Sequence, residues 1–285
     1  MGASLWKLPP EDIESQLNAS NVAMEKICDL PHEKEQTIKC ALWCPVLEGA
    51  NSTNAVDLAS VSSQCINLWT LQDGPCKSHS SVLLDANGRQ SFSCACWNPH
   101  SDCSQLLAGV DSSIKSWDLR TKDFSWTLDN GHSQVVRGMD YNPNQMYHFA
   151  TCGDDCCAKF WDARKLDKPL ITRQDHSHWV WSVRFNPHYD QLVLTSSSDS
   201  QVVLTRLASI ASEPVRVGDD EDAVVYQPQK DMVIQKYDEH EDSVYSVEWS
   251  SADRWTFASL SYDGRMVINH VPSNEKFNIL MPPHQ

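Results

Sequence analysis

The chain has 285 residues, 41% of them hydrophobic, and can therefore bury roughly three quarters of the surface that its unfolded form would expose. Its formal net charge of -15 argues against nucleic acid as a direct ligand, because phosphate binding requires clustered Lys and Arg side chains. The sequence contains neither a run of about 20 apolar residues, as a membrane helix needs, nor an N-terminal secretion signal, so we expect a cytoplasmic chain without membrane insertion.

The first predicted element is a single strand over 5–9, followed by a linker over 10–36. Five copies of one pattern then follow, each with alternating apolar residues that close on an aromatic residue and a turn. The aromatic Tyr141 of the third copy, for example, recurs 44 positions later as Phe185. The copies begin at residues 38, 92, 136, 180 and 244. Each copy therefore predicts a short strand that ends in a turn.

Further strands are predicted inside each copy. The second strands are 56–59, 106–108, 149–151, 192–195 and 256–259, and the third are 66–69, 114–117, 158–161, 202–204 and 266–268. A less regular fourth strand is expected in segments such as 124–126 and 233–235. Four short strands per ~40–45 residues are typical of a propeller blade.

We therefore predict an all-β fold, a WD-repeat β-propeller with five blades and one stray N-terminal strand, forming a single domain over 1–285. The blades are expected at 37–78, 90–129, 132–174, 176–237 (with an acidic insertion at about 213–232) and 240–281.

Three copies share a polar pattern at identical spacing: a His, then a hydroxyl 19 residues later and an Asp 23 residues later. The sets are His132, Thr151 and Asp155; His176, Thr195 and Asp199; and His240, Ser259 and Asp263. Trp161 adds an indole donor to the first set, whereas Thr205 and Asn269 hold the equivalent places in the others. We predict buried hydrogen-bonded relays, since such groups are tolerated inside a sheet only when they are paired.

His, Ser or Thr, and Asp together are also the components of a nucleophilic active site. Here the set recurs in three blades, two of its three hydroxyls are Thr, and the sequence has no Gly-x-Ser-x-Gly motif. The close cysteine pairs lack zinc-site spacing; they are Cys40 with Cys44, Cys94 with Cys96, and Cys156 with Cys157. We therefore predict a non-enzymatic protein with no catalytic residue, metal, cofactor or small-molecule substrate.

Loops at one end of a propeller are the expected place for partner contacts. Candidate residues there are Asp154, His178, Trp179, Ser198 and Tyr262. Trp179 is the strongest of them, because tryptophan is enriched among interface residues that carry binding energy. It lies beside Trp181, and one of the two indoles can instead belong to the core.

Two successive Trp-Asp-x-Arg boxes, at 117–120 and 161–164, favour a second hypothesis. They resemble the box of substrate receptors in cullin-4 ubiquitin ligases, in which the Arg contacts the adaptor. This makes Arg120 and Arg164 candidate partner-binding residues. In other propellers the same Arg only closes a turn, and both interpretations stay open at this point.

Four segments carry a closer resemblance: 131–137, 175–184, 240–253 and 259–265. With them the chain, from Leu5 onward, resembles the family of EARP- and GARP-interacting WD-repeat proteins. The resemblance implies an adaptor of the EARP and GARP tethering complexes, peripheral at the trans-Golgi network and recycling endosomes. It also implies roles in endosomal recycling, endosome-to-Golgi retrograde traffic and sorting of dense-core vesicle cargo. That family has about two further blades ahead of the point matched by Leu5, so the five blades are an incomplete set by comparison with a seven-bladed family.

Overall fold

We analysed a computed structural model of the protein, which describes residues 3–7, 25–30, 32, 37–45, 58–70, 77–83, 90–100, 104–121, 123–212 and 230–280. The chain forms two compact units, Met1–Phe92 and Ser93–Gln285, which are treated separately below. Most of the predicted acidic insertion, and the part of the predicted linker before residue 25, lie outside the described residues.

The described residues of the first unit form two antiparallel sheets. Strand β1 (Ala3–Lys7) pairs with β2 (Glu25–Leu30), so the predicted stray strand has a partner and the predicted linker contains a strand. Four further strands form blade A in chain order: β3 (Ile38–Trp43), β4 (Leu58–Ser62), β5 (Cys65–Thr70) and β6 (Lys77–Leu83). Leu30, Leu58 and Trp69 form part of the buried core of this unit.

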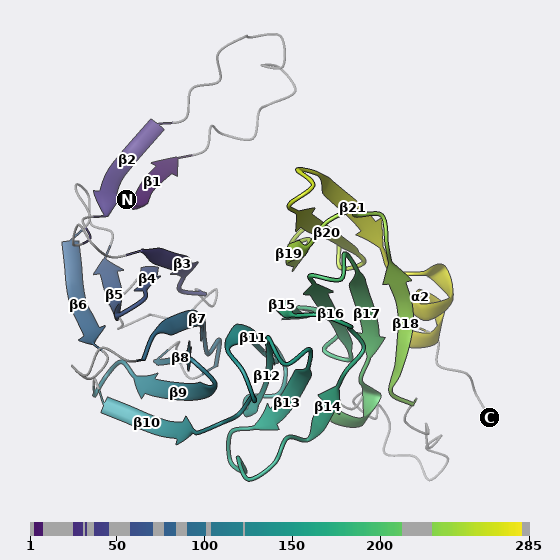
Figure 1. Ribbon diagram of the computed structural model, residues 1–285, viewed down its shortest axis with the longest axis horizontal. Coiled ribbons are helices and arrows are strands. Elements are labelled where there is room, and N and C mark those ends of the chain that lie inside the picture. Colours follow the sequence, from purple (N-terminus) through teal and green to yellow (C-terminus); the bar gives the residue numbers. More distant parts are fainter. Residues whose placement is uncertain are drawn as a thin grey trace, which may run out of the picture. The chain divides into compact units, whose positions relative to one another are not determined.

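In the second unit, the described part of the chain forms four sheets, which we call blades B to E. Blade B consists of β7 (Phe92–Trp97), β8 (Gln105–Val110), β9 (Ser113–Asp118) and β10 (Asp123–Leu128), and blade C of β11 (Val136–Tyr141), β12 (His148–Gly153), β13 (Ala158–Asp162) and β14 (Ile171–Arg173). Blade D consists of β15 (Val180–Phe185), β16 (Leu192–Ser197), β17 (Val202–Arg206) and β18 (Met232–Tyr237), and blade E of β19 (Val244–Trp249), β20 (Thr256–Ser261) and β21 (Met266–His270). Strands adjacent in sequence pair within each sheet. The predicted all-β WD-repeat propeller with five blades is confirmed (Figure 1).

Blade E departs from the expected four strands. After β21 the chain turns into helix α2 (Ser273–Leu280), and a short 3-10 helix, η2 (Ala208–Ile210), follows β17 in blade D. Helix α2 is anchored to blade D, because Glu275 accepts hydrogen bonds of 2.7 and 2.9 Å from the Arg206 guanidinium in β17. Both side chains are buried, so this ion pair is shielded from water.

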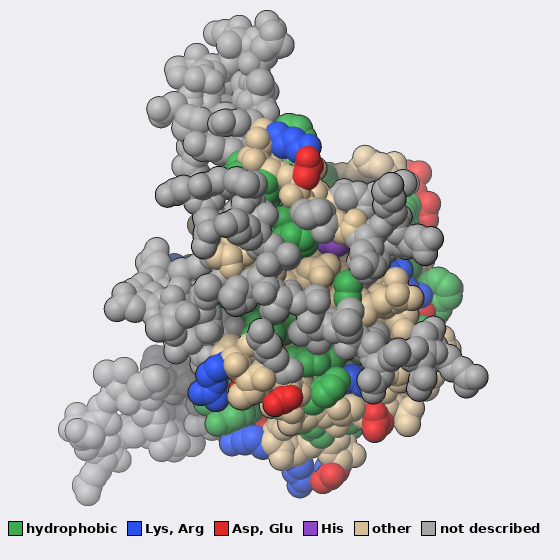
Figure 2. Space-filling view, turned by 90° about the vertical axis from the view of Figure 1, so that its left-hand side faces the viewer, with side chains coloured by type: hydrophobic (Ala, Val, Ile, Leu, Met, Phe, Trp, Pro, Cys, Tyr) green, Lys and Arg blue, Asp and Glu red, His purple; other side chains and the backbone are tan. Residues whose placement is uncertain are grey.

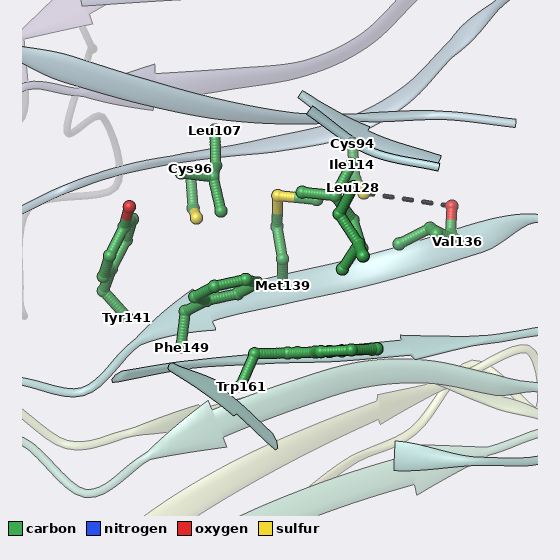
Figure 3. Close-up of a cluster of buried hydrophobic side chains, with 10 residues drawn as sticks. All are labelled: Cys94, Cys96, Leu107, Ile114, Leu128, Val136, Met139, Tyr141, Phe149 and Trp161. Carbon is green, nitrogen blue, oxygen red and sulfur yellow. Dashed lines mark hydrogen bonds between the residues drawn. The ribbon is translucent and has the colours of Figure 1, made fainter. Parts of the chain in front are cut away.

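Neighbouring blades of the second unit pack through apolar side chains. Phe149 and Trp161 of blade C, for example, stack beneath Met139 and face Leu107 of blade B (Figure 3). Equivalent clusters join blades C and D and blades D and E. Every residue of β16 and β17 is buried, because each central strand is covered by neighbours on both faces. Each of these strands accordingly begins with three consecutive apolar residues, at 192–194 and 202–204.

The first strand of blades A, C, D and E has a register shift near its start. In blade C the pairing skips Arg137, in blade D Trp181 and in blade E Tyr245. Such a bulge leaves one residue out of the ladder and redirects its side chain. We call the end of the second unit that carries these bulges, where the first strands begin and the second strands end, the rim.

Candidate protein-interaction site

In blade C, the three residues predicted from spacing lie within hydrogen-bond distance of one another. The two ring nitrogens of His132 are 2.8 Å from an Asp155 carboxylate oxygen and 2.8 Å from the Thr151 hydroxyl. The indole of Trp161 donates to the same hydroxyl at 2.9 Å, and the Ser133 amide donates to Asp155. The relay therefore ties the loop before β11 to the turn after β12 and to β13.

Blades D and E repeat the relay without the indole. His176 contacts Asp199 at 3.1 Å and Thr195 at 2.8 Å, and His240 contacts Asp263 at 3.1 Å and Ser259 at 2.8 Å. A small pocket beside Thr195, lined in part by His176 and Thr205, lies where the indole would be in blade D.

The relays change the acidity of their carboxyl groups. Burial by itself would raise the pKa of Asp155, but the hydrogen bond and charge of His132, with the Ser133 amide and Lys159, outweigh it and lower the pKa to about 2. Asp199 shows the same balance, with burial opposed chiefly by His176, and its pKa also falls to about 2. Both carboxylates are therefore held in the charged, hydrogen-bond-accepting state that the relay needs.

A fourth relay lies in blade A and was not predicted. His32 is 2.8 Å from the Ser60 hydroxyl, and the Trp69 indole donates to that hydroxyl at 2.7 Å. The other ring nitrogen of His32 lies 2.8 Å from the Leu30 carbonyl oxygen. The search for a fixed spacing missed this relay, because His32 precedes the first strand residue Ile38 by six positions, whereas the His of the other three relays does so by four. The hydroxyl-to-indole spacing, nine residues here and ten in blade C, was the available signal.

At the rim, each bulged residue contacts the residue that follows the second strand of its own blade, 17 positions later. Arg137 and Asp154 form a two-pronged ion pair, both hydrogen bonds being 2.7 Å. The Trp181 indole donates to the Ser198 hydroxyl at 2.6 Å. The rings of Tyr245 and Tyr262 lie 4.9 Å apart. The same two positions are therefore in contact in all three blades, through an ion pair in blade C, a hydrogen bond in blade D and a ring contact in blade E.

The Arg137 guanidinium connects the rims of blades C and D. Its central carbon lies 4.9 Å from the ring centroid of Trp181 and 5.8 Å from that of Trp179, distances at which a cation is attracted to an aromatic face. The hydrogen bonds to Asp154 raise the pKa of Arg137 further and keep it charged. Trp179 also contacts His178 and Trp181, and 40% of its surface remains exposed. Such a preorganised, partly exposed tryptophan has the properties of an interface anchor.

Five of the rim residues were candidates from sequence: Asp154, His178, Trp179, Ser198 and Tyr262. The structure shows that Asp154 and Ser198 hold neighbouring side chains, whereas Trp179 and Tyr262 present exposed surface. Trp181 is half-buried between the other groups and is not a core residue. Arg137 and Tyr245 were missed. Both residues directly follow the first apolar residue of their repeat, and this shared position could have identified them from the sequence.

The two Trp-Asp-x-Arg boxes have a local explanation. Arg164 donates two hydrogen bonds to Asp162, of 3.0 and 2.7 Å, and its guanidinium lies 4.6 Å from the Tyr147 ring centroid. In the other box, Arg120 lies 3.7 Å from Asp118 and its side chain is 78% exposed. In both boxes the Asp also accepts the amide of the Arg two residues later, which closes the turn.

The described residues contain no group of three or more His, Cys, Asp or Glu side chains placed to hold a metal ion. Within that same part of the chain, no helix has the length and apolar character to span a bilayer. On the face shown in Figure 2, the described Lys and Arg side chains are intermixed with Asp, Glu and apolar ones.

Comparison with known proteins identifies relatives over nearly the whole chain. A family model described as EIPR1 beta-propeller matches residues 4–205, and a WD domain, G-beta repeat model matches residues 232–268. The EARP-interacting protein homolog of Danio rerio is 46% identical over 98% of this chain and 76% of its own length. EARP and GARP complex-interacting protein 1 of Homo sapiens is 41% identical over the same shares.

Two more distant similarities agree with the fold. The WD repeat-containing protein DWA2 of Arabidopsis thaliana is 35% identical over 95% of this chain and 72% of its own length. A chain in a crystal structure of the mitotic checkpoint complex superposes with a TM-score of 0.65, covering 96% of this chain and 69% of that one, at 17% sequence identity. The latter likeness concerns the propeller architecture alone.

Proposed function

The chain belongs to the EIPR1 β-propeller family, and on that premise we propose that it is a non-enzymatic scaffold that associates with subunits of the EARP and GARP tethering complexes. Relatives named for interaction with these complexes align with 98% of the chain, which supports this proposal. In this role the protein is cytoplasmic and peripheral at the trans-Golgi network and recycling endosomes. It supports endosomal recycling, endosome-to-Golgi retrograde traffic and sorting of dense-core vesicle cargo.

The single observation that carries the proposal within this chain is the Arg137, Trp179 and Trp181 cluster at the rim. Its rings and guanidinium are already fixed by mutual contacts and by Asp154, so little side-chain freedom would be lost on binding. A rigid aromatic group with exposed surface is the kind of feature that dominates the energy of protein interfaces. We propose Trp179 as the main anchor, with His178 beside it.

The test is affinity purification of the tagged chain from cells, followed by quantification of EARP and GARP subunits. We expect the wild-type chain to recover them and Trp179→Ala to recover at least tenfold less. Tyr147→Ala is the matched control, because Tyr147 is also an exposed aromatic residue but lies at the opposite end of blade C. Absence of tether subunits from the wild-type sample would contradict the proposal.

The same samples test the cullin-4 hypothesis. Because the guanidinium of Arg164 is already bound to Asp162 and Tyr147, we favour the turn-closing role of the two boxes over adaptor contact. Recovery of a cullin-4 adaptor by the wild-type chain, with loss in an Arg120→Ala and Arg164→Ala double variant, would reverse this preference.

A further inference from the structure

At the rim, blade E carries a pair of tyrosines where blade C carries the ion pair of Arg137 and Asp154. Tyr245 and Tyr262 lie 4.9 Å apart and are 39% and 65% exposed, so much of each ring faces solvent. In blade C the equivalent position is occupied by Arg137, which supplies a cation to the neighbouring indoles. Among the cation-aromatic contacts of the described residues, none involves either tyrosine of blade E.

The loop beside Tyr262 is rich in carboxylates. The Tyr262 amide donates to the Ser243 carbonyl at 3.1 Å and the Ser261 hydroxyl donates to the Asp242 carbonyl at 2.9 Å, so the loop before β19 lies directly beside Tyr262. That loop, 238–243, and the turn at 261–265 together carry five carboxylates and one guanidinium. The guanidinium, from Arg265, is already paired with Glu241 and Asp263. Asp242 is exposed and Glu241 retains 83% of its side-chain surface.

From this arrangement we propose that the Tyr245 and Tyr262 pair, with Glu241 and Asp242, binds an Arg or Lys side chain of a basic segment in a partner protein. Ring faces attract a cation, and the adjacent carboxylates supply both hydrogen-bond acceptors and a favourable field. A purely apolar partner segment would cover the exposed Asp242 carboxylate without supplying a cation to it, which is unfavourable. The charge on the loop therefore selects a cationic partner. This inference rests on the proposed scaffold function and names the chemistry that the rim recognises.

The primary experiment measures binding of the purified EARP complex to the full chain by biolayer interferometry at two salt concentrations. We expect Tyr262→Ala, and separately the double variant Glu241→Gln and Asp242→Asn, to weaken binding at least tenfold at low salt. The neutral double variant also shows a weaker salt dependence than wild type, because the two carboxylates proposed to face the cation no longer carry charge. Tyr262→Phe keeps the ring and binds within twofold of wild type. Tyr147→Ala serves as the control for loss of an exposed tyrosine, and thermal unfolding verifies that each variant is folded.

The outcomes separate the inference from the proposed function. If the wild-type chain binds the complex and all of these variants bind within twofold of it, the cation site is refuted while the scaffold function stands. If the wild-type chain does not bind, the scaffold function fails, and a second measurement decides the inference. In that measurement, acetyl-arginine amide and its neutral analogue acetyl-citrulline amide are titrated against chain with fluorinated tyrosine. Shifts of the Tyr245 and Tyr262 resonances with arginine alone support the site, and equal or absent shifts refute it.

Discussion

Replacement of Asp155 by alanine tests the energetic role of the relays. In the native chain this carboxylate accepts hydrogen bonds from His132 at 2.8 Å, from the Ser133 amide at 3.2 Å and from the Cys157 amide at 3.3 Å. Asp155→Ala leaves these donors without their acceptor, and the His132 ring is fully buried. Loss of this charged acceptor costs about 2–3 kcal/mol, because the buried His132 ring cannot reach water to replace the hydrogen bond.

For a unit of this size, that free energy lowers the unfolding midpoint by about 5–10 °C. The assay is thermal unfolding followed by circular dichroism and calorimetry, with Asp167→Ala as the control because Asp167 is an exposed carboxylate of the same blade. The control should shift the midpoint by less than about 2 °C, as surface substitutions usually do. An Asp155→Ala midpoint indistinguishable from wild type would show that the relay contributes no stability, and the structural interpretation of all the copies would then be wrong.

Three more predictions follow from the same contacts. The pKa values of Asp155 and Asp199 are lowered to about 2 in the folded state, so the stability that their ionised forms contribute is complete above the unfolded pKa of 3.8 and is lost as the pH falls towards 2. Acid titration should show a loss of about 1 kcal/mol of unfolding free energy per relay. In Asp155→Asn the part of this loss that comes from Asp155 should be absent. A Cβ atom at Gly138 would lie 2.8 Å from the Trp181 carbonyl oxygen, so Gly138→Ala should push apart the first strands of blades C and D. We expect this to lower the free energy of unfolding in urea by about 1–3 kcal/mol. An unchanged urea midpoint would contradict the close approach of the two strands. Glu275→Ala removes the carboxylate that pairs with the buried Arg206 and should cost about 3 kcal/mol, with faster proteolysis of the α2 segment after blade E. Equal protease resistance would show that α2 is held by other contacts.

The arrangement of strands could be read from the sequence because propeller blades repeat. The aromatic that ends each first strand, such as Tyr141 or Phe185, marks the inner strand, and the turn residues mark its end. The relay partners were also accessible, since identical spacing in three copies requires one geometry. Helix α2 was not predicted, because blade E was expected to continue as a fourth strand and the tie between Glu275 and Arg206 joins residues 69 positions apart.

The rim was only partly predictable for a different reason. Trp179 and Tyr262 could be placed on loops by counting residues, but the partners that orient them depend on the bulges in the first strands. A bulge is a change in backbone pairing, and simple alternation assigns the bulged residue to the wrong face. Arg137 and Tyr245 were overlooked for this reason, as both follow a buried valine where alternation expects an ordinary outward residue.

Those bulges have an evolutionary consequence. A side chain that stands outside the ladder contributes little to sheet register, so it can be exchanged without rebuilding the blade. Within this single polypeptide the position already holds arginine, tryptophan and tyrosine in three consecutive blades, on nearly the same backbone. The fold therefore separates what must be kept for assembly from what is free to vary, and new specificities can arise by single substitutions at these points.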